Sequence, residues 1–254
     1  MINTVRSEWT KLFTTRMWLG LLVGACVMAG GFAALYTGLA GQEQNGRPGI
    51  PPVGTQDYET LALSAAASTS VLLLILGIIG MTQEYRHRTA TPTFLTEPRR
   101  GRVIVAKLVA YALVAVPFAV LILAVDLLVV LVYAGARGAA PSLSADNLQT
   151  LGASGLVLVV YAVIGVGVGA LLRNQVAAIV ASLIYLNVVE PIVAGIGALQ
   201  SAYKWLPGGA ARALTTSFQA PDLLQPWQGA LLLLGYGLLA AVLGTLIAVR
   251  RDVV

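Results

Sequence analysis

Residues 83–107 read QEYRHRTATPTFLTEPRRGRVIVAK and separate two apolar stretches, VLLLILGIIGM (71–81) and LVAYALVAVPFAVLILAV (108–125). They interrupt a chain in which 57% of residues are hydrophobic and 11% are charged. A soluble domain carries roughly 25% charged residues, so a chain with less than half of that amount cannot cover its surface with polar groups. Because the charges are confined to a few loops, the sequence predicts several membrane-spanning helices.

Six segments have the roughly 20 apolar residues that a helix needs to cross the hydrocarbon core. We therefore expect an all-α integral membrane protein with a single transmembrane domain, residues 1–254. The third span is long, so it either begins within the interface or breaks at Pro117. A tight turn at Arg173-Asn174-Gln175 separates the fourth and fifth spans. The predicted spans are residues 17–39, 61–81, 104–133, 148–172, 176–199 and 227–249.

Basic residues predict the orientation, because Lys and Arg gather in cytoplasmic loops. With six spans both termini lie on one side, which holds twelve of the sixteen Lys and Arg residues against four on the other. We therefore expect cytoplasmic termini and a cytoplasmic segment 83–103. Residues 201–226 carry Tyr203, Trp205 and Phe218. Aromatic side chains favour the membrane interface, so this outer loop is expected to lie partly in the membrane.

Residues 1–16 have the pattern of a short amphipathic helix that lies on the cytoplasmic leaflet. The apolar residues that share one face are Ile2, Val5, Trp9, Leu12 and Phe13. The alternative is a plain extension of the first span, which would carry Arg16 into the bilayer.

Motifs for nucleotide hydrolysis and metal chemistry are missing from the sequence. No G-x-x-x-x-G-K-[ST] phosphate loop occurs, and a single histidine, His87, cannot form a multi-histidine metal site. Gly152-Ala153-Ser154-Gly155 resembles the serine motif of rhomboid proteases, but His87 lies in a loop and cannot serve Ser154 as a base within the membrane. Cys26 is the only cysteine, so no internal disulfide is possible. We expect no catalytic residue, cofactor or metal in this chain.

Two carboxylates lie within apolar spans, Asp126 in the third and Glu190 in the fifth. A charge near the bilayer centre costs about 2.5–3.5 kcal/mol on insertion scales, so neither is expected to face lipid. Pro191 removes a helix hydrogen bond and frees a carbonyl one turn earlier, near Asn187. These residues either form a substrate- or proton-linked site in a central cavity, lock helices together, or lie near enough to the outer interface to stay hydrated.

The charges of residues 83–103 are too numerous for a mere turn. Phe94 and Leu95 lie among polar residues, with arginines on both sides. A short helix that exposes an aromatic and an aliphatic side chain would suit a groove on another protein. The alternative is a solvated loop that only sets the orientation.

Three groups of residues resemble the permease subunits of type 2 ABC transporters. Glu8-x-x-Lys11-Leu12-x-x-Thr15-Arg16-x-Trp18 is similar to the family's elbow helix. Glu84-Tyr85-Arg86-x-x-Thr89, then Pro98-x-Arg100, then Ala106-Lys107 resemble its cytoplasmic coupling segment. Leu206-Pro207-Gly208-Gly209-Ala210 resembles its outer loop before the sixth span. Arg88 departs from the pattern, since relatives often carry glycine before the threonine.

The resemblance implies a coupling helix between spans 2 and 3 and an ATP-binding cassette subunit that binds ATP and magnesium. It also implies a second permease, identical or related, and the direction of export. The residues expected to couple to the ATPase subunit are Glu84, Tyr85, Arg86, Arg88, Thr89, Phe94, Pro98 and Arg100. The apolar spans favour an amphipathic or hydrophobic cargo, such as a drug, peptide or lipid. The Ala-, Val-, Gly- and Arg-rich composition favours a GC-rich bacterium, and we expect the spans to lie in its inner membrane.

Two other classes of function remain open. A non-transporting membrane scaffold or sensor would use the same basic loop for docking. A membrane-embedded enzyme is disfavoured by the single, misplaced histidine. Nucleic acid is not an expected partner, because the net charge of +5 comes from residues at the ends of apolar segments and not from a basic face with interleaved aromatics.

Overall fold

The computed structural model describes residues 2–42, 49–86, 100–215 and 223–250, and every regular element within these ranges is a helix. Within these ranges six helical segments are long and apolar enough to cross a membrane, which confirms the predicted all-α, six-span architecture. Their bounds are Met17–Leu39, Gln56–Arg86, Gly101–Ala136, Ala145–Leu172, Gln175–Gly195 and Pro226–Leu246.

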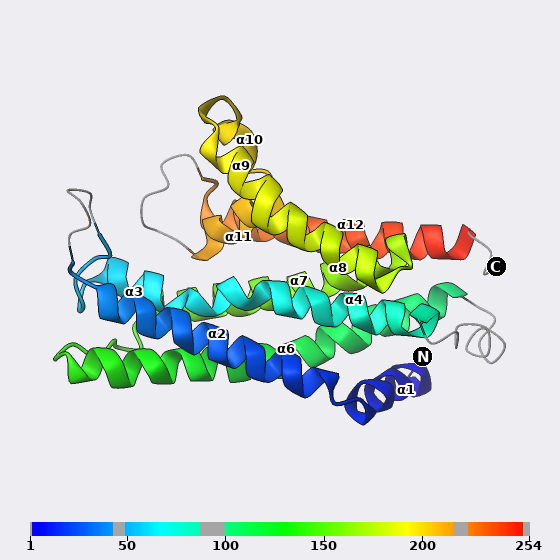
Figure 1. Cartoon of the computed structure of the whole chain (residues 1–254), viewed down its shortest axis with the longest axis horizontal. Coiled ribbons are helices and arrows are strands. Elements are labelled where there is room, and N and C mark those ends of the chain that lie inside the picture. The colour runs from blue at the N-terminus through cyan, green and yellow to red at the C-terminus, as the bar shows by residue number, and fades with distance from the viewer. Residues whose placement is uncertain (1, 43–48, 87–99, 216–222, 251–254) are drawn as a thin grey trace.

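Four long helices lie side by side and form the body of the molecule (Figure 1). They are α2 (Met17–Leu39), α4 (Ser70–Arg86), α6 (Arg100–Ala136) and α7 (Ala145–Leu172). The last helix, α12 (Pro226–Arg250), packs on α7. The start of α1, the facing ends of α4 and α6, and the end of α12 lie at one end of the body (Figure 1). This is expected for an even number of spans, because the chain then starts and ends on the same side.

The second span is longer than predicted and consists of three pieces. It starts with α3 (Gln56–Leu63), continues through the 3-10 helix η1 (Ala65–Thr69) and ends with α4. The hydroxyl of Thr55 accepts a hydrogen bond from the backbone N–H of Tyr58 at 3.3 Å, which caps the first turn. The Tyr58 hydroxyl also bonds the Thr37 hydroxyl at 2.7 Å, so α3 is fixed to α2. These polar contacts extend the helix beyond the apolar residues that predicted it.

Proline affects the third and fifth spans differently. The break considered at Pro117 is not observed, since this residue lies inside α6, a continuous helix of 37 residues. The missing N–H costs one helix bond there, which a membrane helix tolerates. The fifth span instead changes its winding before Pro191. It runs as α8 (Gln175–Ile184), a π-helical turn η2 (Tyr185–Val189) and α9 (Glu190–Gly195). A wider turn accommodates a residue that cannot donate.

The fifth span also ends four residues earlier than predicted. Ile196 is extended, with φ −91° and ψ 113°, and stops α9 at Gly195. The chain then forms η3 (Gly197–Leu199), α10 (Gln200–Tyr203) and α11 (Pro207–Thr215). Helix α11 packs on α12 and α7, so part of the segment expected as an outer loop is a helix in contact with the bundle.

The turn predicted between the fourth and fifth spans depends on the backbone of Arg173 and the side chain of Asn174. Arg173 has a left-handed backbone with φ 51°, which ends α7. The side-chain oxygen of Asn174 then accepts a hydrogen bond from the N–H of Ala177 at 3.0 Å and starts α8.

The N-terminal residues form α1 (Ile2–Thr14), which is set at an angle to α2 (Figure 1). Leu12 is buried in the core, and the indole N–H of Trp9 donates to the carbonyl of Ala110 on α6 at 3.3 Å. Helix α1 is therefore packed on the bundle. Its position on a membrane surface stays a prediction.

Backbone contact between α4 and α7 sets the centre of the bundle. A Cβ added at Gly165 would overlap the carbonyl oxygen of Leu74, and one added at Gly77 would overlap that of Ala162. Both helices therefore require a residue without a side chain where they cross, which is the close approach that small residues permit in membrane helices.

We expect Gly165→Ala to lower the stability of the folded protein, because the new methyl group must separate α7 from α4. Overpacking of this kind costs roughly 1–3 kcal/mol. Thermal unfolding in detergent, followed by size-exclusion chromatography, would measure the shift. Gly152→Ala on the same helix is the control, because nothing lies within 4 Å of a Cβ added there. Equal unfolding temperatures for the two variants would contradict the proposed contact.

Candidate functional site

Four charged side chains from three helices meet near the end of the bundle where α1 lies, and we call them the ionic cluster. Lys107 on α6 places its Nζ 2.5 Å from Glu8 Oε2 and 3.3 Å from Glu84 Oε1. Lys11 places its Nζ 2.7 Å from Glu8 Oε1 and 2.6 Å from Glu84 Oε1. Each lysine therefore bridges the same two carboxylates, one from α1 and one from α4.

Three of the four side chains in the ionic cluster are almost entirely withdrawn from solvent, and Lys11 is partly exposed. Glu8 and Lys107 are each 1% exposed and Glu84 is 6% exposed. Burial alone would lower the pKa of Lys11, but hydrogen bonds and charges from Glu8 and Glu84 outweigh it and raise that pKa above its ordinary value. Buried charges are tolerated only when they are paired and hydrogen-bonded, so the cluster requires all three helices in their places.

The ionic cluster lies at the ends of the two helices that flank the segment expected to couple to the ATPase subunit. Glu84 is in the last turn of α4, and Lys107 is near the start of α6, so their contact joins the two helices that bracket residues 87–99. Glu8 and Lys11 attach α1 to the same joint. A displacement of either bracketing helix would therefore act on α1.

The predicted coupling residues have different surroundings. Glu84 is bonded inside the chain, and Tyr85 lies under the guanidinium of Arg173, 5.7 Å from the ring centre. Arg86 is exposed and donates to Gln175 on α8 at 3.4 Å. Arg100 opens α6, and its side chain lies outside the described part, as do the residues Arg88, Thr89, Phe94 and Pro98. A coupling role for all eight residues stays a prediction.

We expect Lys107→Met to destabilise the protein strongly, because Glu8 and Glu84 would keep their buried charges with only Lys11 to balance them. Removing one partner of a buried pair costs about 3–5 kcal/mol. Lys11→Met should cost much less, since the Lys11 side chain is 38% exposed. Unfolding temperatures of the purified variants would test this order. The double variant Glu8→Gln/Lys107→Met should recover part of the loss, and a neutral Lys107→Met would refute the buried pairing.

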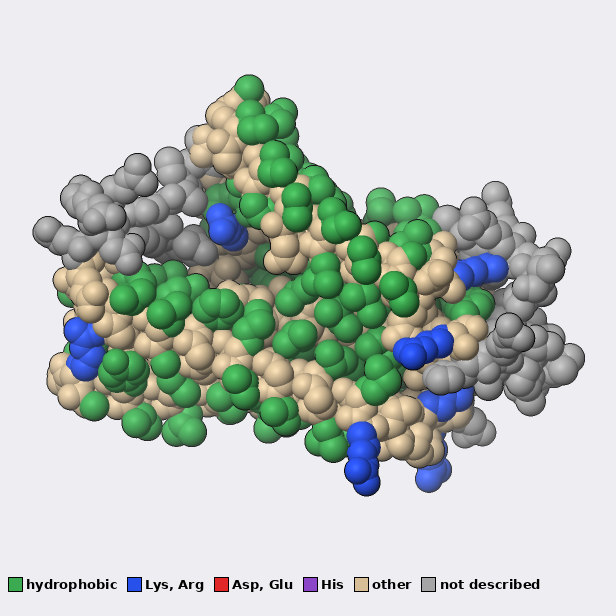
Figure 2. Space-filling view, viewed as in Figure 1, with side chains coloured by type: hydrophobic (Ala, Val, Ile, Leu, Met, Phe, Trp, Pro, Cys, Tyr) green, Lys and Arg blue, Asp and Glu red, His purple; other side chains and the backbone are tan. Residues whose placement is uncertain are grey.

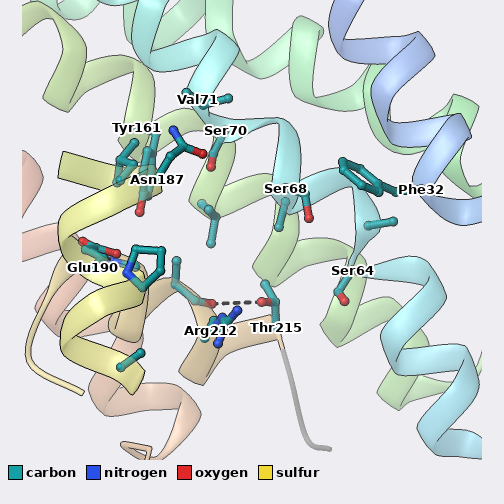
Figure 3. A pocket seen from close by; sticks show the side chains of 18 of the residues that line it. Phe32, Ser64, Ser68, Ser70, Val71, Tyr161, Asn187, Glu190, Arg212 and Thr215 are labelled. Carbon is teal, nitrogen blue, oxygen red and sulfur yellow. Dashed lines mark hydrogen bonds between the residues drawn. The ribbon is translucent and has the colours of Figure 1, made fainter. Parts of the chain in front are cut away.

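A second candidate site is a cavity of about 840 Å³, which we call the outer hollow. It is lined by α2, η1 and the start of α4 on one side, and by η2, α9 and α11 on the other, with α7 between them (Figure 3). The space-filling view also shows a hollow between the protruding α9–α10 region and the body (Figure 2). Asn187 and Glu190, two of the predicted intramembrane polar residues, both line it.

Glu190 fastens α11 to α9. Its side chain is on α9 and only 4% exposed, and Oε1 accepts a hydrogen bond from the N–H of Gly208 at 3.0 Å. That N–H belongs to the first turn of α11, where backbone donors have no partner inside the helix. A Cβ added at Gly208 would overlap the carboxylate. The carboxyl and the missing side chain together allow the two short helices to meet.

Arg212 is the other charged residue that lines the outer hollow within the described ranges. It is exposed, and its guanidinium lies 5.9 Å from the centre of the Tyr203 ring, within the range of a cation–π contact. Among the described residues no carboxylate lies within ion-pair distance of Arg212. Its hydrogen-bond donors are therefore not used by a neighbouring acid.

Asp126 lies elsewhere. It is fully buried on α6, it does not line the outer hollow, and neither carboxylate oxygen has a hydrogen-bond partner in the described part of the chain. Ser154 on α7 is also buried and its hydroxyl lacks a partner among those residues. The structure therefore brings Asn187 and Glu190 together and leaves Asp126 apart. The choice between a pathway role and a structural role for these three residues stays open.

Sequence reasoning missed the ionic cluster and Arg212. The signal for the cluster was available, because Glu8 and Lys11 are one helical turn apart and Lys107 stands alone in the apolar run VIVAKLVAYAL (103–113). A lone lysine in such a run requires a buried acid. Arg212 gave no comparable signal, because its placement depends on how α11 folds back against α12.

Residues 4–189 match the family described as "ABC-2 family transporter protein". The match covers well over half of the chain. The chain belongs to the ABC-2 transporter family. It is the permease subunit of a type 2 ABC transporter, as the sequence predicts. No curated protein matches it. The matched residues include the ionic cluster but end one residue before Glu190, so α9 and α11 lie beyond the ABC-2 match.

We expect Gly208→Ala to push α11 away from Glu190 and to change the shape of the outer hollow. The cost of such overpacking is roughly 1–3 kcal/mol. A lower unfolding temperature and faster maleimide labelling of a cysteine placed at Ser68 would report the two effects. Gly197→Ala is the matched control, because nothing lies within 4 Å of its added Cβ. Unchanged labelling and stability in Gly208→Ala would rule out this contact.

Proposed function

We propose that this ABC-2 permease is the membrane half of an ATP-driven exporter, coupled to a separate ATP-binding cassette subunit. The observation that carries the proposal is the ionic cluster, which joins the helices on both sides of residues 87–99 to α1. In this proposal the ATPase subunit docks at residues 83–103, and closure of two such subunits on ATP and magnesium displaces α4 and α6 together. Packed helices respond to such a displacement as rigid bodies.

The charge distribution supports a cytoplasmic location for this end. Basic side chains gather toward the end where α1 lies, while apolar side chains are spread over the visible face of the body (Figure 2). The excess of Lys and Arg on that side is the positive-inside pattern. We place both termini and the coupling segment in the cytoplasm of a bacterium, with the six spans in its plasma membrane.

The outer hollow supports a pathway shared by two permeases. Ser68, Asn187 and Arg212 are exposed and line it in a chain that we place in lipid. Polar groups at membrane depth must face water or protein instead of hydrocarbon. A second copy, or a related permease, would cover the open side and complete a path for an amphipathic or hydrophobic cargo. A scaffold or sensor without transport is the second candidate, because it would use the same docking segment.

Coexpression with an ATP-binding cassette protein, chosen from the genes that neighbour this one, tests the proposal. We expect the two to copurify, the ATPase rate to depend on the permease, and Lys11→Gln to reduce that dependence several-fold while the chain stays folded. Lys11 is suitable because it bridges Glu8 and Glu84 but is partly exposed. Arg6→Gln on the same helix is exposed and serves as the control.

The outcomes separate the candidates. Cargo movement driven by ATP supports the exporter. Copurification without cargo movement favours the scaffold or sensor. ATP hydrolysis by the isolated chain, or labelling of residues 83–103 from outside the cell, would overturn the proposal.

A further inference from the structure

We propose that the outer hollow selects an organic anion with an apolar portion, and that Arg212 binds its anionic group. This inference rests on the proposed function, since it takes the outer hollow as part of the transport pathway. It goes further by giving the sign of the cargo's charge.

The first argument is that Arg212 is available. Its side chain is exposed in the outer hollow and has no carboxylate within ion-pair distance in the described ranges. Arg137, by comparison, uses its guanidinium to bond the carbonyls of Thr37 and Ala40 at the end of α2. The Arg212 guanidinium lies 5.9 Å from the centre of the Tyr203 ring, and a cation–π contact at this distance does not take up its hydrogen-bond donors.

The second argument is that the acid in the lining does not cancel this charge. Glu190 is 4% exposed, and its carboxylate is bonded to the N–H of Gly208. In Figure 3 the Glu190 carboxylate lies at the α9 ribbon, and the Arg212 guanidinium lies apart from it, nearer to Thr215. The accessible charge of the described lining is therefore positive.

The third argument concerns the remaining walls. Ser68 and Ser70 also line the outer hollow, and their hydroxyls can donate to a ligand. Phe32 and Val71 line the same side and Leu186 lines the opposite one, which supplies apolar surface within a few side chains of the polar groups. A carboxylate, phosphate or sulfate can accept several bonds from a guanidinium at once. An apolar portion of the same molecule would then contact Phe32 and Leu186.

The test uses the full chain in phosphatidylcholine nanodiscs and three fluorescent probes with the same dodecyl tail. The probes end in a carboxylate, a phosphocholine or a trimethylammonium group, and empty discs correct for partition into lipid. We expect the carboxylate probe to bind about tenfold more tightly than the trimethylammonium probe, as charge-assisted hydrogen bonds predict. Arg212→Gln should remove this preference, and Arg212→Lys should keep most of it.

Lys204→Gln is the matched control, because it removes one positive charge from the same segment and Lys204 does not line the outer hollow. Equal affinity for the anionic and cationic probes in the unaltered chain would overturn the inference, and so would a preference that survives Arg212→Gln. The affinities of the three probes for the unaltered chain test the charge preference even if Arg212→Gln does not fold.

Two further arms give the source of the anion and separate this inference from the proposed function. If phosphatidylglycerol in the disc competes with the carboxylate probe, the site binds a membrane lipid. If phosphatidylglycerol does not compete, the site binds a soluble amphiphile. Both results support an anion-selective site. No ATPase subunit is needed for binding, so a failed charge preference leaves the exporter intact. Failed copurification with the ATPase subunit leaves the binding result intact.

Discussion

Lys107 is the residue on which the geometry of one end of the molecule depends. Its ammonium group is buried on α6 and stabilised by carboxylates from α1 and α4, with a further bond at 3.4 Å to the carbonyl of Gly80. An uncompensated ammonium in that position would cost several kcal/mol, so the two acids must approach it. The same requirement brings the Glu8 side of α1 against the bundle. These contacts add to those of Leu12 and Trp9, which also hold α1 against the bundle.

Packing divides the six spans into a fixed group and a looser group. In the apolar stretches of Gln56–Arg86 and Ala145–Leu172, 61% and 56% of residues are buried within the chain, whereas the apolar stretch of Gln175–Gly195 is 17% buried. The high burial of the second and fourth spans follows from the glycines at the α4–α7 crossing, because no side chain separates the two backbones there. The fifth span has a π-helical turn and few contacts within the chain. Elements with few buried contacts are those that open and move. The outer hollow is therefore lined both by the well-buried second and fourth spans and by the poorly buried fifth span.

The sequence predicted the six spans because the alternation of apolar runs and charged loops is a property of single segments. Its errors occur where one segment depends on another. The second span starts early because Thr55 caps it and Tyr58 bonds Thr37, and hydropathy records neither contact. The fifth span ends early at the extended residue Ile196. Glu190 stood out from its surroundings, but its bond to Gly208 depends on how α11 returns.

The positions of Glu190 and Arg212 explain how one cavity can contain both signs of charge and still discriminate. If the two side chains formed an ion pair, the pair would neutralise itself and present only apolar stems and a weak dipole to a ligand. Instead the carboxylate is bonded to a backbone N–H in the first turn of α11, and the guanidinium, on the same helix, lies within cation–π range of Tyr203. Helix α11 thereby satisfies the acid with its backbone and leaves the base exposed. Selectivity then follows from the fold of one nine-residue helix, and the acid is needed to hold that helix in place.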